Sequence, residues 1–353
     1  MNNCIHLLRT LGATILLILA FSNLSGCSQA PAQTKGILKG DAPRIADGED
    51  WASFLGPRGN GTSSEKGLEP ALWNPHPPIL WELQLGVSYG GPSIVGNKFY
   101  QFDRVGDKER LSCYDLATAQ PLWYWDSGST PYRDPYGYNN GPRCSPIVDG
   151  NLIFVYGVTG NLYCIDANSH KLVWKKETFS EYGVIPNFFG VASNPAAFQD
   201  KLLVMIGGSP AESQGLTTQM LAQVKPNGSA VVAFDKKTGN ELYKVGDDLA
   251  SYTSMSVQTV NGKHTGLAFL RSGLLAFDPS TGTEIHTYPW RADFLESVNA
   301  SVPVTDGQRV LVSESYQIGS TLLDAQSTPW TEVWKDKAIS KPVELPSTGQ
   351  PRS

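Results

Sequence analysis

The chain has 353 residues, of which 17% are charged, 41% apolar and 10% aromatic, and it contains 35 Gly and 24 Pro. This aromatic content and low charge density exclude a disordered chain, and the composition also excludes a coiled coil, which Ala, Glu, Lys, Leu and Arg would dominate. A formal net charge of −5 provides no basic surface for nucleic acid. Short apolar runs between frequent turn residues predict an all-β protein.

The N-terminus has the organisation of an export signal. The apolar run at residues 11–21 is too short to cross a bilayer as a helix, which takes about 20 residues, but it has the length of a signal-peptide core. Leu24-Ser25-Gly26-Cys27 then resembles the lipobox of bacterial lipoproteins. The alternative is an ordinary secretory signal followed by a chance Cys.

The lipobox resemblance implies cleavage before Cys27, a lipid on its thiol, and attachment to a membrane of the bacterial cell envelope. Residues 1–26 are then a lipoprotein signal peptide. Residues 27–50, which are mostly small and polar, form a flexible tether. Ser28 is not the Asp that retains such lipoproteins at the inner membrane, so the outer membrane is favoured.

An internal repeat organises the rest of the chain. Five segments share an Asp that follows a short apolar run, and a large side chain comes eight residues later, or ten in the last segment. These repeat positions are Asp115 and Trp123, Asp166 and Trp174, Asp235 and Tyr243, Asp278 and His286, and Asp324 and Trp334. Each Asp is expected to accept backbone N–H groups of the following turn, and each large side chain to pack on a neighbouring unit.

Each repeat predicts four antiparallel strands in about 45 residues, which is the size of a β-propeller blade. Residues 51–336 contain five to six such units, and residues 337–353 are expected to form an irregular tail. Residues 79–85 have the pattern of an outer strand that would complete the last blade. A ring of seven or eight blades would be incomplete, and the sequence leaves open whether the chain is truncated or closes unusually.

The third repeat carries a family resemblance. Residues 233–243, Ala-Phe-Asp-Lys-Lys-Thr-Gly-Asn-Glu-Leu-Tyr, resemble the AxDxxTGxxxW docking motif of the pyrroloquinoline-quinone (PQQ)-like repeat β-propellers, with Tyr in place of Trp. The resemblance extends from about Trp51 to Trp334. The family includes PQQ dehydrogenases and also non-catalytic members, such as the lipoprotein subunit of the machine that assembles outer-membrane proteins.

Candidate binding residues lie on the loops that lead into the innermost strands, because these loops form one mouth of the central channel. Tyr there offers an amphipathic surface, Asn and Asp offer donors and acceptors, and Arg143 could bind a carboxylate. The candidates are Asp134, Tyr136, Tyr138, Asn139, Asn140, Arg143, Asn187, Tyr252, Glu296, Asn299, Glu314 and Tyr316. The alternative is that these side chains only pack the loops together.

Two functions follow from these features. The first is an envelope-anchored, non-catalytic scaffold that needs no cofactor and binds a protein partner or an extracytoplasmic ligand at the channel mouth. The second, implied by the resemblance, is a dehydrogenase that uses PQQ and calcium to oxidise an alcohol or sugar. Asp134, Asn139, Glu296 and Asn299 could supply oxygen ligands to calcium, but the sequence lacks the adjacent Cys pair common in such enzymes.

We expect Cys27→Ser to leave the precursor without lipid, because the thiol is the acylation site. Metabolic labelling with a radioactive fatty acid, followed by fractionation of the envelope, measures this. Cys4→Ser is the matched control and should be labelled like the wild type. Labelling of Cys27→Ser at the wild-type level would contradict the lipobox interpretation.

Overall fold

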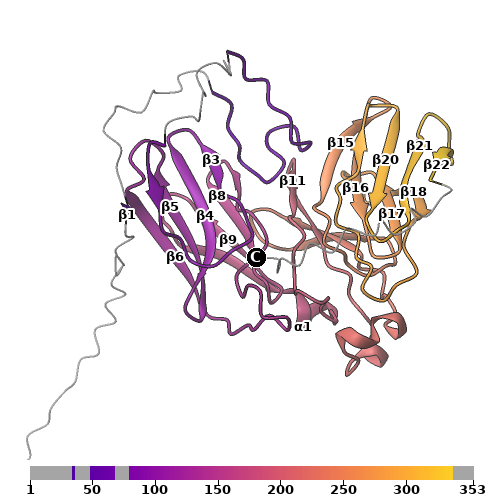
Figure 1. The fold of residues 1–353 in the computed structure, drawn as a ribbon, viewed down its shortest axis with the longest axis horizontal. Coiled ribbons are helices and arrows are strands. Elements are labelled where there is room, and N and C mark those ends of the chain that lie inside the picture. The colour runs from indigo at the N-terminus through magenta and orange to yellow at the C-terminus, as the bar shows by residue number, and fades with distance from the viewer. Residues whose placement is uncertain (1–33, 36–47, 68–78, 337–353) are drawn as a thin grey trace, which may run out of the picture. The chain divides into compact units, whose positions relative to one another are not determined.

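The structure is a computed structural model that describes residues 34–35, 48–67 and 79–336. The expected signal peptide, Cys27, most of the tether and the C-terminal tail lie outside these residues. Strands β3 to β22 form five four-stranded antiparallel sheets, each built from strands that are consecutive in the chain (Figure 1). The predicted all-β fold of propeller blades is therefore confirmed, and the sheets are called blades 1 to 5.

The blades have similar lengths and order. Blade 1 comprises β3 (Ser93–Val95), β4 (Lys98–Val105), β5 (Lys108–Asp115) and β6 (Pro121–Ser129); blade 2 comprises β7 (Ile147–Asp149), β8 (Leu152–Tyr156), β9 (Asn161–Asp166) and β10 (Leu172–Glu177). Blade 3 comprises β11 (Ala196–Phe198), β12 (Lys201–Met205), β13 (Val231–Asp235) and β14 (Glu241–Val245). Blade 4 comprises β15 (Ser256–Val260), β16 (Lys263–Phe269), β17 (Gly273–Phe277) and β18 (Glu284–Pro289), and blade 5 comprises β19 (Val304–Thr305), β20 (Arg309–Glu314), β21 (Gly319–Asp324) and β22 (Thr331–Lys335).

The helical segments are short. They are α1 (Thr178–Tyr182) and two 3₁₀ turns, η2 (Ala211–Ser213) and η3 (Thr218–Gln223), which lie in the insertion between β12 and β13. Among the described residues no helix has the length and apolar character needed to cross a membrane.

The repeated Asp is the last residue of the third strand in blades 1, 2, 3 and 5 and directly follows it in blade 4, and it holds the turn that follows. Asp235 Oδ1 accepts the backbone N–H of Lys237 at 3.0 Å and that of Thr238 at 2.8 Å. The other four repeated Asp side chains accept N–H groups two or three residues further on, at 2.6–3.1 Å. These turns satisfy backbone donors that would otherwise be left open at the end of the strand.

Large side chains on the outer strands pack on these turns in the next blade. The Trp174 indole N–H donates to the carbonyl of Lys236 at 2.9 Å, and the Tyr243 hydroxyl donates to the carbonyl of Pro279 at 2.7 Å. Trp123 stacks on His170 at 4.5 Å between ring centroids. In the last such junction His286 stacks on Trp330 at 5.1 Å.

A glycine in the turn makes this packing possible. Gly239 has φ +72°, and a Cβ on it would lie 2.8 Å from the Trp174 ring; Gly282, at φ +76°, has the same relation to the Tyr243 ring at 2.4 Å. Glycine is therefore required at these two positions both for the backbone conformation and for the close approach of the ring.

Residues 79–85 make the same contact with blade 1. The Trp81 indole N–H donates to the carbonyl of Leu116, the residue after Asp115, at 2.9 Å, and the Trp81 ring stacks on Phe99. The segment was expected to be an outer strand that completes the last blade, and the contact of Trp81 with the Asp turn of blade 1 is the one that such a strand makes. Its strand β2 (Glu82–Leu83) pairs antiparallel with β1 (Thr34–Lys35) and is not paired with the strands of blade 5.

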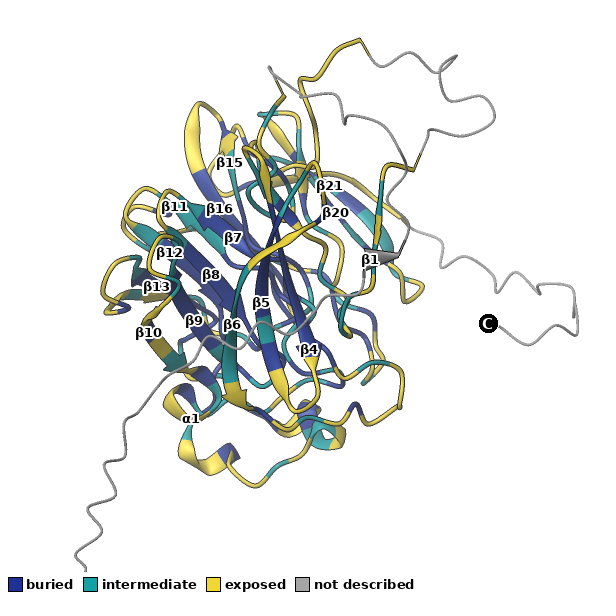
Figure 2. Ribbon diagram, turned by 90° about the vertical axis from the view of Figure 1, so that its left-hand side faces the viewer, coloured by how far each residue is buried: buried dark blue, intermediate teal, exposed yellow. Residues whose placement is uncertain are grey.

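Four buried apolar clusters fill the spaces between consecutive blades. In blade 2, Ile153 and Val155 pack toward blade 1, whereas Phe154 and Tyr156 pack toward blade 3. Successive side chains of a strand point to opposite faces, so both faces of this sheet are covered (Figure 2). Dispersion and burial at these junctions hold the blades together.

We expect Trp174→Ala to lower the free energy of unfolding by about 3–5 kcal/mol, because it empties a junction between two blades. Trp334 occupies the corresponding position in blade 5 but is 43% exposed, whereas Trp174 is 9% exposed. Trp334→Ala should therefore cost less than about 1 kcal/mol. Urea denaturation followed by circular dichroism measures both changes. Equal losses of unfolding free energy in the two variants would show that burial of Trp174 at the junction does not stabilise the protein.

Candidate functional site

The connections that lead into the innermost strands gather at one end of the blades, called here the loop end. Phe188, Leu249 and Val298 come from the connections before β11, β15 and β19, and they pack with Leu221 of the β12–β13 insertion in one buried cluster. The connections before β11, β15 and β19 thus share a packed base.

Asp134 and Arg143 form a buried ion pair in the loop before β7. Arg143 Nη2 donates to Asp134 Oδ2 at 2.8 Å. The Arg143 side chain is 6% exposed and the Asp134 side chain is 0% exposed. The other carboxylate oxygen of Asp134 accepts the N–H of Tyr136 at 2.8 Å, and Asn140 Oδ1 accepts the N–H of Asp134 at 2.7 Å. These polar groups hold the loop in shape.

The same loop is tied to the segment that leads into β3. Asn139 Nδ2 donates to the carbonyl of Ser88 at 3.3 Å, and Arg143 Nη2 donates to the carbonyl of Asn139 at 3.0 Å. The Arg143 guanidinium also lies 5.3 Å from the ring of Tyr89 and 5.5 Å from that of Tyr132, within the range of cation–π attraction. Arg143 is thereby committed to contacts within the protein.

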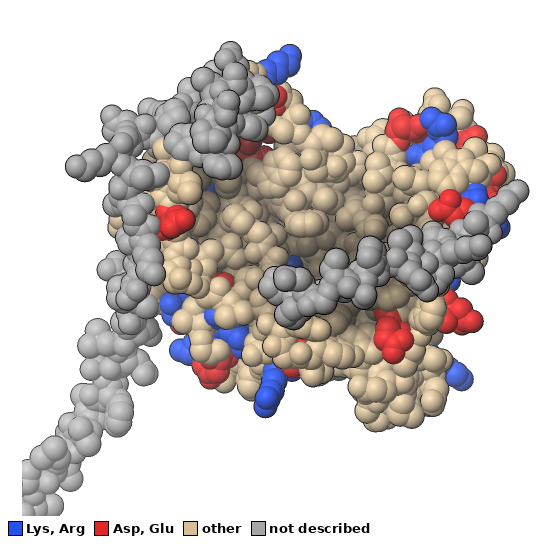
Figure 3. Space-filling model, in the orientation of Figure 1, with Lys and Arg blue, Asp and Glu red and all other residues tan. Residues whose placement is uncertain are grey.

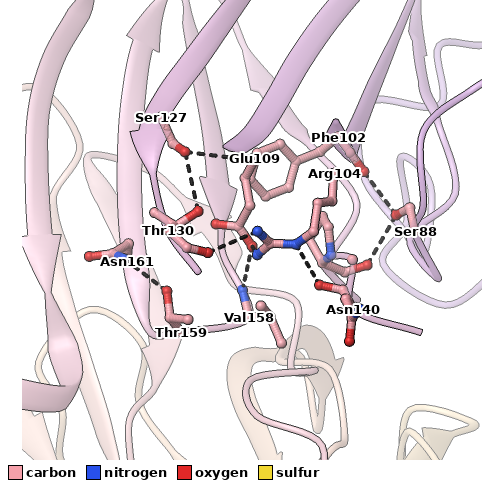
Figure 4. Close-up of polar contacts among 12 residues, drawn as sticks. Ser88, Phe102, Arg104, Glu109, Ser127, Thr130, Asn140, Val158, Thr159 and Asn161 are labelled. Carbon is pink, nitrogen blue, oxygen red and sulfur yellow. Dashed lines mark hydrogen bonds and ion pairs between the residues drawn. The ribbon is translucent and has the colours of Figure 1, made fainter. Parts of the chain in front are cut away.

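A second buried ion pair, Arg104 with Glu109, lies beneath this loop (Figure 4). The two residues are direct cross-strand partners on β4 and β5, with Arg104 Nη2 3.6 Å from Glu109 Oε1. Arg104 donates to the carbonyls of Asn140 at 2.6 Å and Thr130 at 2.8 Å, and Glu109 accepts the N–H of Val158 in blade 2 at 2.9 Å. Burial raises the pKa of Glu109, while the Val158 N–H and Arg104 oppose that rise.

This second pair was not predicted from the sequence. A signal was present, because Arg104 and Glu109 flank the hairpin turn at Gly106-Asp107 and opposite charges at such positions face each other across a hairpin. Burial of the pair depends on the loop before β7 and on blade 2, which local sequence does not reveal.

Aromatic rings link the loops before β7, β11 and β15. Tyr136 lies 5.2 Å from Phe189, and Phe189 lies 5.9 Å from Tyr252, between ring centroids. The Phe189 N–H donates to the Tyr252 hydroxyl oxygen at 2.6 Å, and Asn187 Nδ2 donates to the carbonyl of Ala250 at 2.9 Å. Burial raises the pKa of Tyr252, so its hydroxyl remains protonated at neutral pH.

The remaining candidates lie in the loop before β19 and at the end of β20. Asn299 is fully buried and donates to the carbonyls of Leu270 and Trp290, and Glu314, also buried, accepts a hydrogen bond from Ser297 Oγ at 3.3 Å. Burial raises the pKa of Glu314. Glu296 is exposed.

Five aromatic side chains remain exposed on connections at the loop end, and we call them the aromatic rim. They are Tyr89 (60% exposed), Tyr136 (49%), Tyr138 (75%), Phe294 (49%) and Tyr316 (37%). In Figure 3, Lys, Arg, Asp and Glu form separate spots, with no large patch of one sign on the face in view. Asp134, Asn139 and Arg143 are bonded within their loop, whereas the candidates Tyr136, Tyr138 and Tyr316 face solvent and Tyr252 packs in the interior.

Two of the four oxygen donors considered for calcium are already engaged within their own loop. The Asp134 carboxylate is neutralised by Arg143, and Asn139 Oδ1 already accepts the N–H of Gly141 at 2.8 Å. Glu296 is exposed on its loop, whereas Asn299 is fully buried. Among the residues that the structure describes, no three His, Cys, Asp or Glu side chains are grouped as a metal centre requires.

The five blades, the Asp turns and the docked aromatic rings define a β-propeller of the PQQ-like repeat type. The family model described as outer membrane protein assembly factor BamB matches residues 107–349, which is more than half of the chain. The chain belongs to this family.

Comparison with solved structures gives matches at low sequence identity. BamB from Moraxella catarrhalis is 12% identical, with 71% of this chain and 73% of that chain covered and a TM-score of 0.39. A europium-containing methanol dehydrogenase is 12% identical, with coverages of 70% and 71% and a TM-score of 0.37. The quinohemoprotein alcohol dehydrogenase from Comamonas testosteroni is 13% identical, with coverages of 78% and 46% and a TM-score of 0.47. No curated protein matches the chain in sequence.

We expect Asp134→Asn to lower the free energy of unfolding by about 3 kcal/mol, because it leaves the Arg143 guanidinium buried without a counter-charge. Tyr138→Ala, in the same loop but at a side chain that is 75% exposed, should change it by less than about 0.5 kcal/mol. Urea denaturation curves of the two variants measure the difference. A neutral effect of Asp134→Asn would show that the ion pair does not support the loop.

Proposed function

We propose that the protein is an envelope-anchored, non-catalytic scaffold that binds a protein partner through the aromatic rim. The observation that carries this proposal is the division of side chains at the loop end. Asp134, Asn139 and Arg143 are bonded to their own loops, whereas the aromatic side chains above them are exposed.

Exposed aromatic side chains on a firmly held base suit protein recognition. Tyr and Phe are enriched in protein–protein interfaces, where they bury large areas. The base under the rim is braced by the buried cluster around Phe188 and by the Asp134–Arg143 pair. Such a surface loses little conformational freedom on binding, which favours affinity.

The anchor belongs to the same proposal. A lipid on Cys27 and a tether over residues 27–50 would hold the propeller, residues 51–336, at the envelope, with the outer membrane favoured by Ser28. The description of the family as an outer membrane protein assembly factor supports both this location and a protein partner.

Site-specific crosslinking tests the rim. A photoreactive phenylalanine analogue at Tyr138, in cells with an intact Cys27, should form an adduct with an envelope protein. The same analogue at Leu242, which is 44% exposed on the outer strand β14, is the matched control and should form none. Adducts of equal yield from both positions, or none from Tyr138, would contradict a binding surface at the rim.

A second measurement separates the scaffold from the dehydrogenase. Purified protein is mixed with PQQ and calcium, and alcohol- or sugar-dependent dye reduction is followed. We expect no substrate-dependent reduction, because Asp134 and Asn139 are already engaged within their loop. Turnover that requires both PQQ and calcium would overturn the scaffold proposal.

A further inference from the structure

A hollow of about 340 Å³ lies along the innermost strands of blades 2, 3 and 4 and extends to Asn194 and Ser254 in the connections before β11 and β15. It is lined by β7, β11 and β15 and is covered by the opening segment, residues 52–59. Asp149 and Phe198, the last residues of β7 and β11, lie in its wall. None of the five aromatic side chains of the rim lies in its lining, so the hollow is distinct from the aromatic rim.

The opening segment is fixed over the hollow by bonds to three blades. Trp51 bridges to Ile94 in blade 1, and the carbonyl of Ala52 accepts the N–H of Val148 in blade 2 at 2.8 Å. Gln258 Nε2 in blade 4 donates to the carbonyl of Gly59 at 2.6 Å. The cover is therefore part of the fold, and the hollow is formed before any ligand arrives.

The lining combines apolar and aromatic side chains with Ser and Asn, and its charges are compensated. Phe54, on the cover, is 47% exposed, and the rings of Phe198 and His264 meet edge to face at 5.3 Å. The Asp149 carboxylate in the wall is paired with Lys236, and the Arg58 guanidinium is paired with Glu49. A charged ligand would find no free counter-charge in these pairs, whereas a ring would find aromatic neighbours.

We propose that this hollow binds an uncharged small molecule of one or two rings that carries a hydroxyl or carbonyl group. Phe54 and Phe198 contact the ring, and the exposed His264 imidazole forms a hydrogen bond with the polar group. The volume lies at the lower end of the range of small-molecule sites, which fits a ligand of this size. The proposal does not depend on the aromatic rim or on a protein partner.

Titration calorimetry with 1-naphthol tests the site on the purified protein. We expect saturable binding that Phe54→Ala weakens at least tenfold. Phe294→Ala is the matched control, because Phe294 is 49% exposed on the rim, and it should change the affinity less than twofold. Both side chains are half exposed, so both variants should fold, which circular dichroism checks.

Two further probes define the ligand class. 1-Naphthoate, which carries a charge, should bind at least tenfold more weakly than 1-naphthol. His264→Ala should weaken 1-naphthol about fivefold and leave naphthalene, which lacks the hydroxyl, unchanged. Three results would each overturn the proposal. They are the absence of saturable 1-naphthol binding, an affinity of Phe54→Ala equal to that of the wild type, and binding of 1-naphthoate as tight as that of 1-naphthol. Loss of binding in Phe294→Ala alone would place the probe at the rim and would also overturn it.

Discussion

The fold depends on one repeated contact, in which a large side chain from the outer strand of one blade packs on the Asp turn of the next. Trp174 on the Lys236 carbonyl and Tyr243 on the Pro279 carbonyl are two instances, and Trp81 on the Leu116 carbonyl is a third. A single four-stranded sheet would expose two apolar faces. The contact sets the distance between neighbouring sheets so that those faces meet.

Because the blades are rigidly spaced, the connections at the loop end are forced close together, and their polar groups must be satisfied inside the protein. The Asp134–Arg143 and Arg104–Glu109 pairs accomplish this with balanced charges. Removing two charges from water is costly, so each pair is stable only with additional hydrogen bonds, which the backbone of the same loops supplies. The aromatic side chains that do not fit this interior remain on the surface.

The blade architecture was predictable from the sequence because its determinants are local. The Asp, the Thr-Gly turn and the aromatic residue of Ala233–Tyr243 lie within 11 positions, and turn chemistry and strand periodicity depend on neighbours. The roles of Asp134 and Arg143 were not predictable, because a carboxylate and a guanidinium have the same sequence signature whether they bind a ligand or each other. Their pairing depends on a loop conformation that other blades impose.

The opening segment has a consequence for how the chain matures. Its contacts with Gln258 join residues separated by up to 200 positions, whereas most strand pairs join neighbours in sequence. Contacts of such separation form late, since the entropy of closing a long loop must first be overcome. In a chain that is synthesised from its N-terminus, Trp51 and Ala52 can bond to blades 1 and 2 early, whereas residues 58–59 reach Gln258 only after blade 4 has followed. The cover is therefore attached in two stages, first to the early blades and last to blade 4.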